Sequence, residues 1–177
     1  MAPPPPPLPP SPSGGGVSCA IEGVPAAGVR PLRHAVLRPG QPAERLVYPG
    51  DDDESSLHLA VRDRESVVSV ASFYLEALPE RVEVSLCGLA AGTPGLRIRG
   101  MATEPAHRSK GFGRALVDHG LRAMCAQHLG VRAAWCNART TASGYYERVG
   151  FVVASRAFEM PDIGPHVVMV RGVDAPA

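Results

Sequence analysis

The chain has 177 residues, of which 45% are hydrophobic and 20% charged, a composition typical of one globular domain. Its 18 basic and 17 acidic residues leave a formal net charge of +1. Proteins that bind nucleic acid through its phosphates usually carry a basic excess, so this balance argues against nucleic acid as a partner.

The N-terminal residues 1–16 are a run rich in Pro, Ser and Gly, without the positive and apolar segments of a secretion signal. We therefore expect a disordered tail, followed by one domain over residues 17–173. A docking segment for a proline-reading domain is the alternative role of this tail. No later segment reaches the roughly 18 apolar residues of a membrane span, so no membrane partner is expected.

The four cysteines form neither a CxxC pair nor a zinc-type pattern with histidines. A domain of this size and composition does not need disulfides, which predicts reduced thiols, a cytoplasmic location and no metal. Cys136 is expected to be a small buried filler, because no recognisable motif places a base beside it. The sequence does not fix the oligomeric state, and it is compatible with a homodimer.

The first ordered element is predicted as a strand over residues 17–24, where apolar and polar residues partly alternate. A short helix over residues 30–37 follows, with Pro31 in its first turn, where a missing N–H group is tolerated. This helix is predicted from three apolar residues at helical spacing, Val29, Leu32 and Val36.

A polar loop over residues 41–56 comes next and contains an acidic run at residues 51–54. Such runs are usually solvated, and attraction of a cationic amine substrate is the alternative. Residues 57–62 and 66–75 are rich in Val and predict an antiparallel hairpin with a tight turn. A linker with one short segment at residues 82–86 then leads to the second half of the chain.

The second half begins with a strand at residues 96–103, followed after a loop by the strongest predicted helix, residues 113–128. This helix has one apolar stripe: Gly113, Leu116, Val117, Gly120, Leu121, Met124 and Cys125. A strand at residues 131–137 and a helix at residues 141–149 follow, and Gly150 ends that helix.

Two closing strands are predicted at residues 151–158 and 166–171, joined by a turn at residues 161–165. Strands and helices thus alternate through the second half of the chain. The pattern predicts a mixed α/β fold, in which helices pack on a sheet.

The loop before the strongest helix, Arg108-Ser-Lys-Gly-Phe-Gly-Arg114, has the chemistry of an anion site. A helix N-terminus exposes unpaired N–H groups and the positive end of the helix dipole. The two glycines let the main chain approach an anion closely, and the basic side chains add charge around it. We expect a pyrophosphate to contact Arg108, Ser109, Lys110, Gly111, Phe112, Gly113 and Arg114.

Two nucleotide-binding motifs are excluded, because the sequence has neither G-x-x-x-x-G-K-[ST] nor G-x-G-x-x-G after a first strand. The spacing R-x-x-G-x-G alone is weak, since a glycine-rich turn before an amphipathic helix would also match it. A second motif follows one strand later, at Ala142-Ser-Gly-Tyr-Tyr-Glu-Arg-Val-Gly-Phe151.

Together the two motifs resemble the GNAT superfamily of N-acetyltransferases. R-x-x-G-x-G resembles its motif A, which cradles the pyrophosphate of coenzyme A, and the second segment resembles A-x-x-[FLY]-Y-x-x-x-G-F. The resemblance covers residues 96–158 most closely and residues 17–171 more loosely. Residues 98–102, 135–139 and 163–169 are similar to the ElaA/YitI-like branch of the superfamily.

This resemblance implies an acyl-CoA N-acyltransferase fold, whose central, mostly antiparallel sheet is flanked by helices. It also implies direct transfer of an acetyl group from acetyl-CoA, as co-substrate, to an amine acceptor. The strand at Met101, Ala102 and Thr103 would pair with the pantetheine arm, in a gap where it splays from the strand at residues 131–137. A main-chain N–H group near Met101 would polarise the thioester carbonyl.

The resemblance further implies catalytic roles. Tyr146 matches the tyrosine of the second motif and would act as general acid toward the departing thiolate. Its neighbour Tyr145 is expected to be an aromatic residue of the helix face. The base that accepts the amine proton is left open among His166, His58 and Glu104.

Many members of the superfamily carry an asparagine seven residues before this tyrosine, where this chain has Arg139. Asn137, two residues earlier, is expected to take over a cofactor contact. A module that binds acyl-CoA without turnover is the alternative function, but Tyr146 and the intact loop at residues 108–113 favour the enzyme. The sequence does not identify the amine acceptor, a small molecule or a protein.

Overall fold

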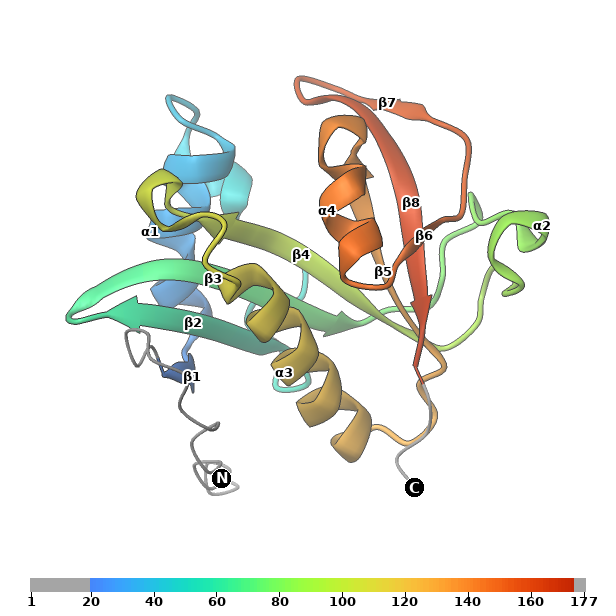
Figure 1. The fold of residues 1–177 in the computed structure, drawn as a ribbon, viewed down its shortest axis with the longest axis horizontal. Helices are drawn as coiled ribbons and strands as arrows, with labels where there is room; N and C mark the ends of the chain where they lie inside the picture. Colours follow the sequence, from blue (N-terminus) through green and yellow to red (C-terminus); the bar gives the residue numbers. More distant parts are fainter. Residues whose placement is uncertain (1–19, 174–177) are drawn as a thin grey trace.

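The computed structural model describes residues 20–173, so the predicted tail at residues 1–16 lies outside the described part of the chain. The strands are β1 (Ile21–Gly23), β2 (Leu57–Asp63), β3 (Ser66–Leu75), β4 (Gly95–Thr103), β5 (Ala133–Arg139), β6 (Val152–Val153), β7 (Phe158–Met160) and β8 (Gly164–Gly172). The helices are α1 (Ala26–Leu37), α2 (Val84–Cys87), α3 (Phe112–Gln127) and α4 (Ser143–Arg148), with 3₁₀ turns η1 (Ala43–Leu46), η2 (Pro105–His107) and η3 (Thr140–Ala142). They form the predicted mixed α/β architecture (Figure 1). Within residues 20–173, no helix is both long and apolar enough to span a bilayer.

One sheet runs through the molecule in the order β1-β2-β3-β4-β5-β8-β6, and β7 pairs with β8. Its pairs are antiparallel, apart from the parallel pair of β4 with β5. In the described structure, this parallel pair joins residues 95–97 to residues 133–135 and goes no further. Beyond these residues the two strands separate, which divides the sheet into two halves (Figure 1). The separation agrees with the splay that the family resemblance implies.

Helix α3 covers one face of the first half of the sheet (Figure 1), and its predicted apolar stripe is confirmed. The buried members are Leu116, Val117, Gly120, Leu121 and Met124, while Gly113 and Cys125 are half-buried. A Cβ atom on Gly120 would lie 2.1 Å from Cζ of Phe73, so only glycine allows this close approach. The helix therefore packs directly on a buried ring of β3, which fixes the position of the loop at its start.

Helix α1 packs on the opposite face of the sheet, where Val29 meets Ala60, Val70 and Ala102. It begins at Ala26, before the predicted start, so Pro31 lies inside the helix and the prediction that placed it in the first turn was wrong. The proline is tolerated because it lies on the exposed side of the helix. Burial of Ala26 and Val29 by the added turn offsets the hydrogen bond that the ring removes.

The strand predicted at residues 151–158 was also wrong, since the structure has two short strands, β6 and β7, separated by residues 154–157. Ser155 provides the physical reason. Its Oγ accepts a hydrogen bond from the N–H group of Val168 at 2.8 Å, in place of a backbone carbonyl of a continuing strand. The same hydroxyl donates to the carbonyl oxygen of Arg156 at 2.8 Å, which ends the ladder locally.

The acidic run at residues 51–54 is not wholly solvated, because Asp51 is only 3% exposed. The buried guanidinium of Arg33 lies 2.9 Å from the Asp51 carboxylate, and Tyr74 Oη donates to it at 2.5 Å. Burial acts to raise the pKa of Asp51, but hydrogen bonds from Tyr74 and Arg33 hold it below its ordinary value. Asp51 is therefore an internal ion-pair partner, and the prediction of a solvated residue was wrong at this position.

Candidate active site

The loop before α3 leaves the N-terminus of the helix open. The backbone turns through left-handed conformations at Ser109 (φ 61°) and Gly111 (φ 83°). Gly111 is the N-cap residue, and no side chain caps the first N–H groups of the helix. A Cβ atom on Gly111 would meet no atom within 4 Å, so the space beside this residue is open. A helix end of this kind can bind a phosphate through its main-chain N–H groups.

The loop opens into a cleft of about 880 Å³, which follows the separation between β4 and β5. In Figure 1, α3 and α4 lie on either side of the place where β4 and β5 separate. The cleft brings most of the predicted site residues together: Met101, Ala102, Thr103, Arg108, Ser109, Gly111, Phe112, Gly113, Arg114, Asn137, Tyr146 and His166. Lys110 is exposed and does not line the cleft, so its contact with a cofactor stays a prediction.

Tyr146 projects from α4 toward β4, where its hydroxyl donates to the sulfur of Met101 at 3.7 Å. The rings of Tyr145 and Phe151 hold it edge-on, with centroid distances of 5.1 and 5.7 Å. Burial raises the pKa of Tyr146 well above its ordinary value, and the neighbouring Cys136 and Tyr145 add to this effect. The phenol is thus protonated at neutral pH and can act as a proton donor.

Gly113 has a role that the sequence did not indicate. A Cβ atom on it would lie 2.6 Å from Oη of Tyr145, so the glycine makes room for that tyrosine against the first turn of α3. Burial raises the pKa of Tyr145 to about 12. Its hydroxyl is buried without a hydrogen-bond partner among the described residues.

Of the three candidate bases, His166 lines the cleft. It lies on β8 opposite Arg139, and its Nδ1 is 2.8 Å from the carbonyl oxygen of Gly164. A carbonyl oxygen can only accept, so a proton on Nδ1 satisfies this contact and leaves the lone pair on Nε2. The neutral tautomer with this proton has the form that a general base requires.

His58 and Glu104 do not line the cleft. His58 is buried, and its ring nitrogens lie 2.7 Å from Ser72 Oγ and 2.7 Å from the carbonyl oxygen of Asp51. Burial lowers the pKa of His58, and both of its nitrogens are already engaged. Glu104 instead lies 2.9 Å from Nδ1 of His107. The geometry favours neither residue as the base.

The end of β5 carries Asn137 and Arg139. Asn137 lines the cleft, and its contact with a cofactor stays a prediction. Arg139, at the position where the family often has asparagine, donates to the carbonyl oxygen of Leu37 at 3.2 Å. This contact connects the end of β5 to the end of α1 across the cleft.

Among the cleft residues that the sequence analysis did not place in the site are Tyr48, Arg97 and Arg99. The alternation of Leu96-Arg-Ile-Arg99 could have indicated that both arginines share the face of β4 opposite the apolar core. Tyr48 follows η1 and reaches the site through tertiary contacts that no local pattern predicts. Residues 20–173 contain no group of three or more His, Cys, Asp or Glu arranged to hold a metal ion.

Comparison with known proteins connects this site to acetyltransferases. A sequence model described as "Acetyltransferase (GNAT) domain" matches residues 54–153, which include the phosphate loop and Tyr146. The chain is also 36% identical over 140 residues to the uncharacterized N-acetyltransferase YitI of Bacillus subtilis (strain 168). That match covers 79% of this chain and 87% of the relative.

Solved structures share the fold at low sequence identity. Escherichia coli ElaA has a TM-score of 0.65 and 17% identity, and the match covers 86% of this chain and 99% of that one. An aminoglycoside 6'-N-acetyltransferase complexed with coenzyme A has a TM-score of 0.64 and 11% identity, over 89% of this chain and 99% of that one. These likenesses concern the arrangement of the elements.

Proposed function

Because the chain belongs to the GNAT family of N-acetyltransferases, we propose that it moves an acetyl group from acetyl-CoA directly to a primary amine of a small molecule or protein. The opening between β4 and β5 is the observation that supports this proposal best. It joins the uncapped start of α3 to Tyr146 within one cleft. A thioester whose phosphates bind at the start of α3 can therefore reach Tyr146, which can donate a proton to its sulfur.

The residues present fit acetyl-CoA as co-substrate. The first N–H groups of α3, with Arg108 and Arg114 beside them, suit its pyrophosphate. Beyond residue 97, β4 has no pairing with β5 in the described structure, so its backbone can pair with the pantetheine arm at residues 101–103. Asn137, on β5, lines the same cleft.

In the reaction, the C–N bond forms as the C–S bond of acetyl-CoA breaks, and the amine loses the proton that the sulfur gains. A main-chain N–H group near Met101 stabilises charge on the carbonyl oxygen. The Tyr146 hydroxyl donates its proton to the departing sulfur, and its raised pKa keeps that proton in place until then. Nε2 of His166 accepts the amine proton, directly or through water.

The alternative is a sensor with the same fold, which would bind acetyl-CoA without turnover. The protonated Tyr146 in the cleft favours the enzyme, because a sensor does not need a proton donor there. We propose a cytoplasmic location, which the three free thiols of the described residues, Cys87, Cys125 and Cys136, support.

The deciding experiment is an assay of purified protein with acetyl-CoA and a panel of primary amines, which follows release of the free CoA thiol. We expect at least one amine to raise the rate above hydrolysis, and mass spectrometry to detect the acetylated amine. Acetyl-CoA binding by calorimetry without acetylation of any amine would contradict the enzyme and support the sensor.

A further inference from the structure

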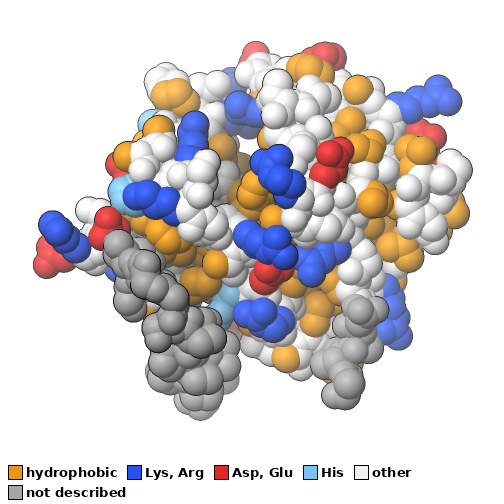
Figure 2. Space-filling view, in the orientation of Figure 1, with side chains coloured by type: hydrophobic (Ala, Val, Ile, Leu, Met, Phe, Trp, Pro, Cys, Tyr) orange, Lys and Arg blue, Asp and Glu red, His pale blue; other side chains and the backbone are white. Residues whose placement is uncertain are grey.

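Seven arginines line the cleft, to which no Asp or Glu among residues 20–173 contributes. The arginines are Arg38, Arg97, Arg99, Arg108, Arg114, Arg139 and Arg148. Figure 2 shows Lys and Arg side chains gathered around the hollow on one face of the molecule. Carboxylates would be needed to attract a polycationic acceptor, so this lining indicates an acceptor of different charge.

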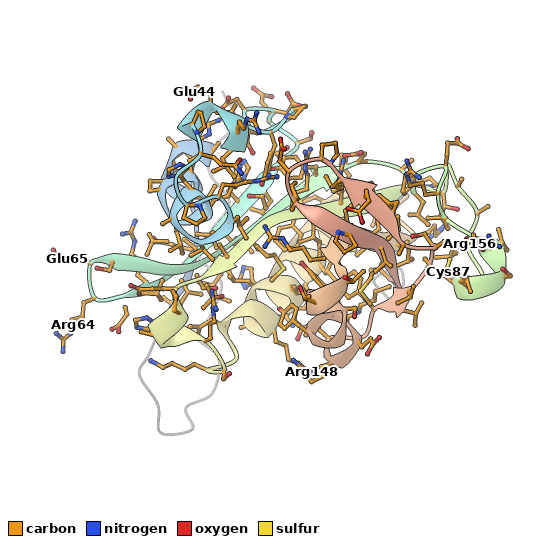
Figure 3. The ribbon with its side chains drawn as sticks, turned by 90° about the horizontal axis from the view of Figure 1, so that it is seen from above. Glu44, Arg64, Glu65, Cys87, Arg148 and Arg156 are labelled. Atoms are coloured by element: carbon orange, nitrogen blue, oxygen red, sulfur yellow. The ribbon has the colours of Figure 1, made fainter. Side chains whose placement is uncertain are left out.

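Several of these arginines have other tasks. Arg108 and Arg114 flank the phosphate loop, and Arg139 donates to the carbonyl oxygen of Leu37. Arg148 projects outward from α4, away from the interior (Figure 3). These tasks leave three lining arginines unexplained: Arg38, Arg97 and Arg99.

The side chain of Arg99 is partly buried, and within the described residues it makes neither an ion pair nor a hydrogen bond. Its guanidinium carbon lies 4.4 Å from the ring centroid of Tyr48 and 5.7 Å from that of Tyr74. Burial lowers the pKa of Arg99, and the charge of Arg97 lowers it further. A guanidinium that has lost water without gaining an anion is unfavourable in the free protein and suited to binding one.

The carboxylates around this cluster have other partners. Asp51 is held by Arg33 and by Tyr74, whose ring also contacts Arg99, and it does not line the cleft. Glu76 pairs with Arg97 at 2.7 Å. The acidic run at residues 51–54 is therefore not placed to attract a cationic amine, because its buried residue, Asp51, already pairs with Arg33.

Arg99 lies close to the place of the proposed chemistry. It precedes Met101 by two residues, which the main chain spans in at most about 7 Å. The proposed pyrophosphate site, residues 108–114, follows the end of β4 at Thr103, so Met101 lies between it and Arg99 along the chain, and the pantetheine arm is uncharged. The phosphates of the co-substrate are thus matched to other residues, and an anion at Arg99 would belong to the acceptor.

We propose that the acceptor is a primary amine whose own molecule carries an acidic group, a carboxylate or a phosphate, and that Arg99 binds this group. The inference rests on the proposed function and names its acceptor class. The planar fork of a guanidinium suits two oxygens of either group. The surrounding positive charge also favours the neutral form of the amine, which is the form that attacks.

The test uses matched pairs of acceptors with the full chain and acetyl-CoA: glycine, β-alanine and 4-aminobutyrate against their amides, and 2-aminoethyl phosphate against ethanolamine. We expect kcat/KM for thiol release to favour the acidic member of at least one pair by about tenfold or more. Arg99→Gln should bring this ratio close to one by raising the acceptor KM, and Arg99→Lys should retain part of it. Arg156→Gln, at an exposed position beside α2 (Figure 3), is the matched control and should keep the ratio.

Calorimetric binding of the same amines to the CoA-saturated protein separates this inference from the proposed function. Binding of the acidic members that depends on Arg99, without acetylation, would support the inference and overturn the function. Equal kcat/KM values within every pair, or a preference that survives Arg99→Gln, would overturn the inference and leave the function standing. Absence of both acetylation and Arg99-dependent binding would overturn both.

Discussion

Two sites contain polar side chains that are held in buried surroundings, and each can be altered by one substitution. At the first, Tyr146 keeps a protonated hydroxyl in the cleft, 3.7 Å from the sulfur of Met101. At the second, Asp51 and Arg33 form a fully buried ion pair between α1 and the sheet. The first place concerns catalysis and the second stability, and each can be tested by removing one functional group.

We expect Tyr146→Phe to lower kcat by about 10²-fold or more, because general acid catalysis contributes that much when a donor is positioned. The dissociation constant of acetyl-CoA should change little, since the ring and its packing remain. Steady-state kinetics and calorimetry measure the two quantities. Tyr145→Phe is the matched control, because that hydroxyl has no partner among the described residues. Equal turnover by Tyr146→Phe and the wild type would remove Tyr146 from the mechanism.

Asp51→Asn should lower the free energy of unfolding by about 3 to 5 kcal/mol, because it leaves the Arg33 charge buried without its counter-ion. Urea denaturation measures this difference. Asp52→Asn is the control: Asp52 is 78% exposed and pairs with Arg30 at the surface, so its loss should change little. Similar effects of the two variants would contradict the assignment of Asp51 as an internal ion-pair partner.

The same pair predicts a pH dependence. The folded-state pKa of Asp51 is lowered, so its carboxylate contributes stability above its unfolded pKa of about 3.9. This contribution is lost as the pH falls through the folded-state value. The Asp51 contribution to the stability difference between wild type and Asp51→Asn should therefore be fully present at pH 7 and shrink below about pH 4. The buried His58 loses stability earlier, below about pH 6.5, and this loss should be larger in Asp51→Asn, because the Asp51 charge raises the pKa of His58.

At the scale of elements, the loop and α3 act as one unit. The close contact of Gly120 with Phe73 fixes the helix on the sheet, and the left-handed backbone at Gly111 turns the chain into its first turn. The open helix end is therefore held against β4 before any ligand arrives. Phosphate binding by this unit should depend on charge at residue 111 more than on the side chain's size, because the space beside it is open.

We expect Gly111→Asp to weaken acetyl-CoA binding by about tenfold or more, since a carboxylate would face the pyrophosphate. Gly111→Ala is the matched control for backbone strain, because any side chain is unfavourable at a φ of 83°. Calorimetry with both variants separates the two effects. An unchanged affinity in Gly111→Asp would contradict the phosphate loop.

Elements whose signal is local could be predicted from the sequence. The hairpin at residues 57–75 and the helix at residues 113–128 have apolar patterns that need no distant partner. The break in the strand at residues 151–158 could not be predicted, because it depends on a contact between Ser155 and Val168, 13 residues apart. Likewise, the partners that bury Asp51 lie 18 and 23 residues away in the sequence.

The candidate site shows the same division. Its phosphate loop and Tyr146 belong to contiguous motifs, so they could be recognised in the sequence. The arginines of β4 required knowledge of which face of the strand lines the cleft. Tyr48 required the path of the loop after η1, which long-range packing determines.

At the scale of the whole molecule, the two halves of the sheet are joined by the short parallel pair of β4 with β5. A ligand that pairs with β4 beyond residue 97 would contact both halves at once. Binding to the folded state alone raises its stability, so the co-substrate should stabilise the whole chain.

Acetyl-CoA at one hundred times its dissociation constant should raise Tm by about 5 to 11 °C, from ~2.7 kcal/mol of linked binding energy and ~2 to 4 °C per kcal/mol. Thermal melts followed by circular dichroism measure the shift. Gly111→Asp at the same ligand concentration should show a smaller one. A wild-type Tm that does not respond to saturating acetyl-CoA would contradict binding in this cleft.

The packing of Arg97 has an optical consequence. The chain contains one tryptophan, Trp135, which is buried beneath the cleft and donates from Nε1 to the carbonyl oxygen of Glu76 at 2.9 Å. The guanidinium of Arg97, which lines the cleft, lies 4.6 Å above the indole ring. An anion that draws Arg97 away from the indole would change the charge above the ring and shift its fluorescence. The emission of Trp135 should therefore respond to any acceptor that displaces Arg97, and a fluorescence titration can follow this response without an added label.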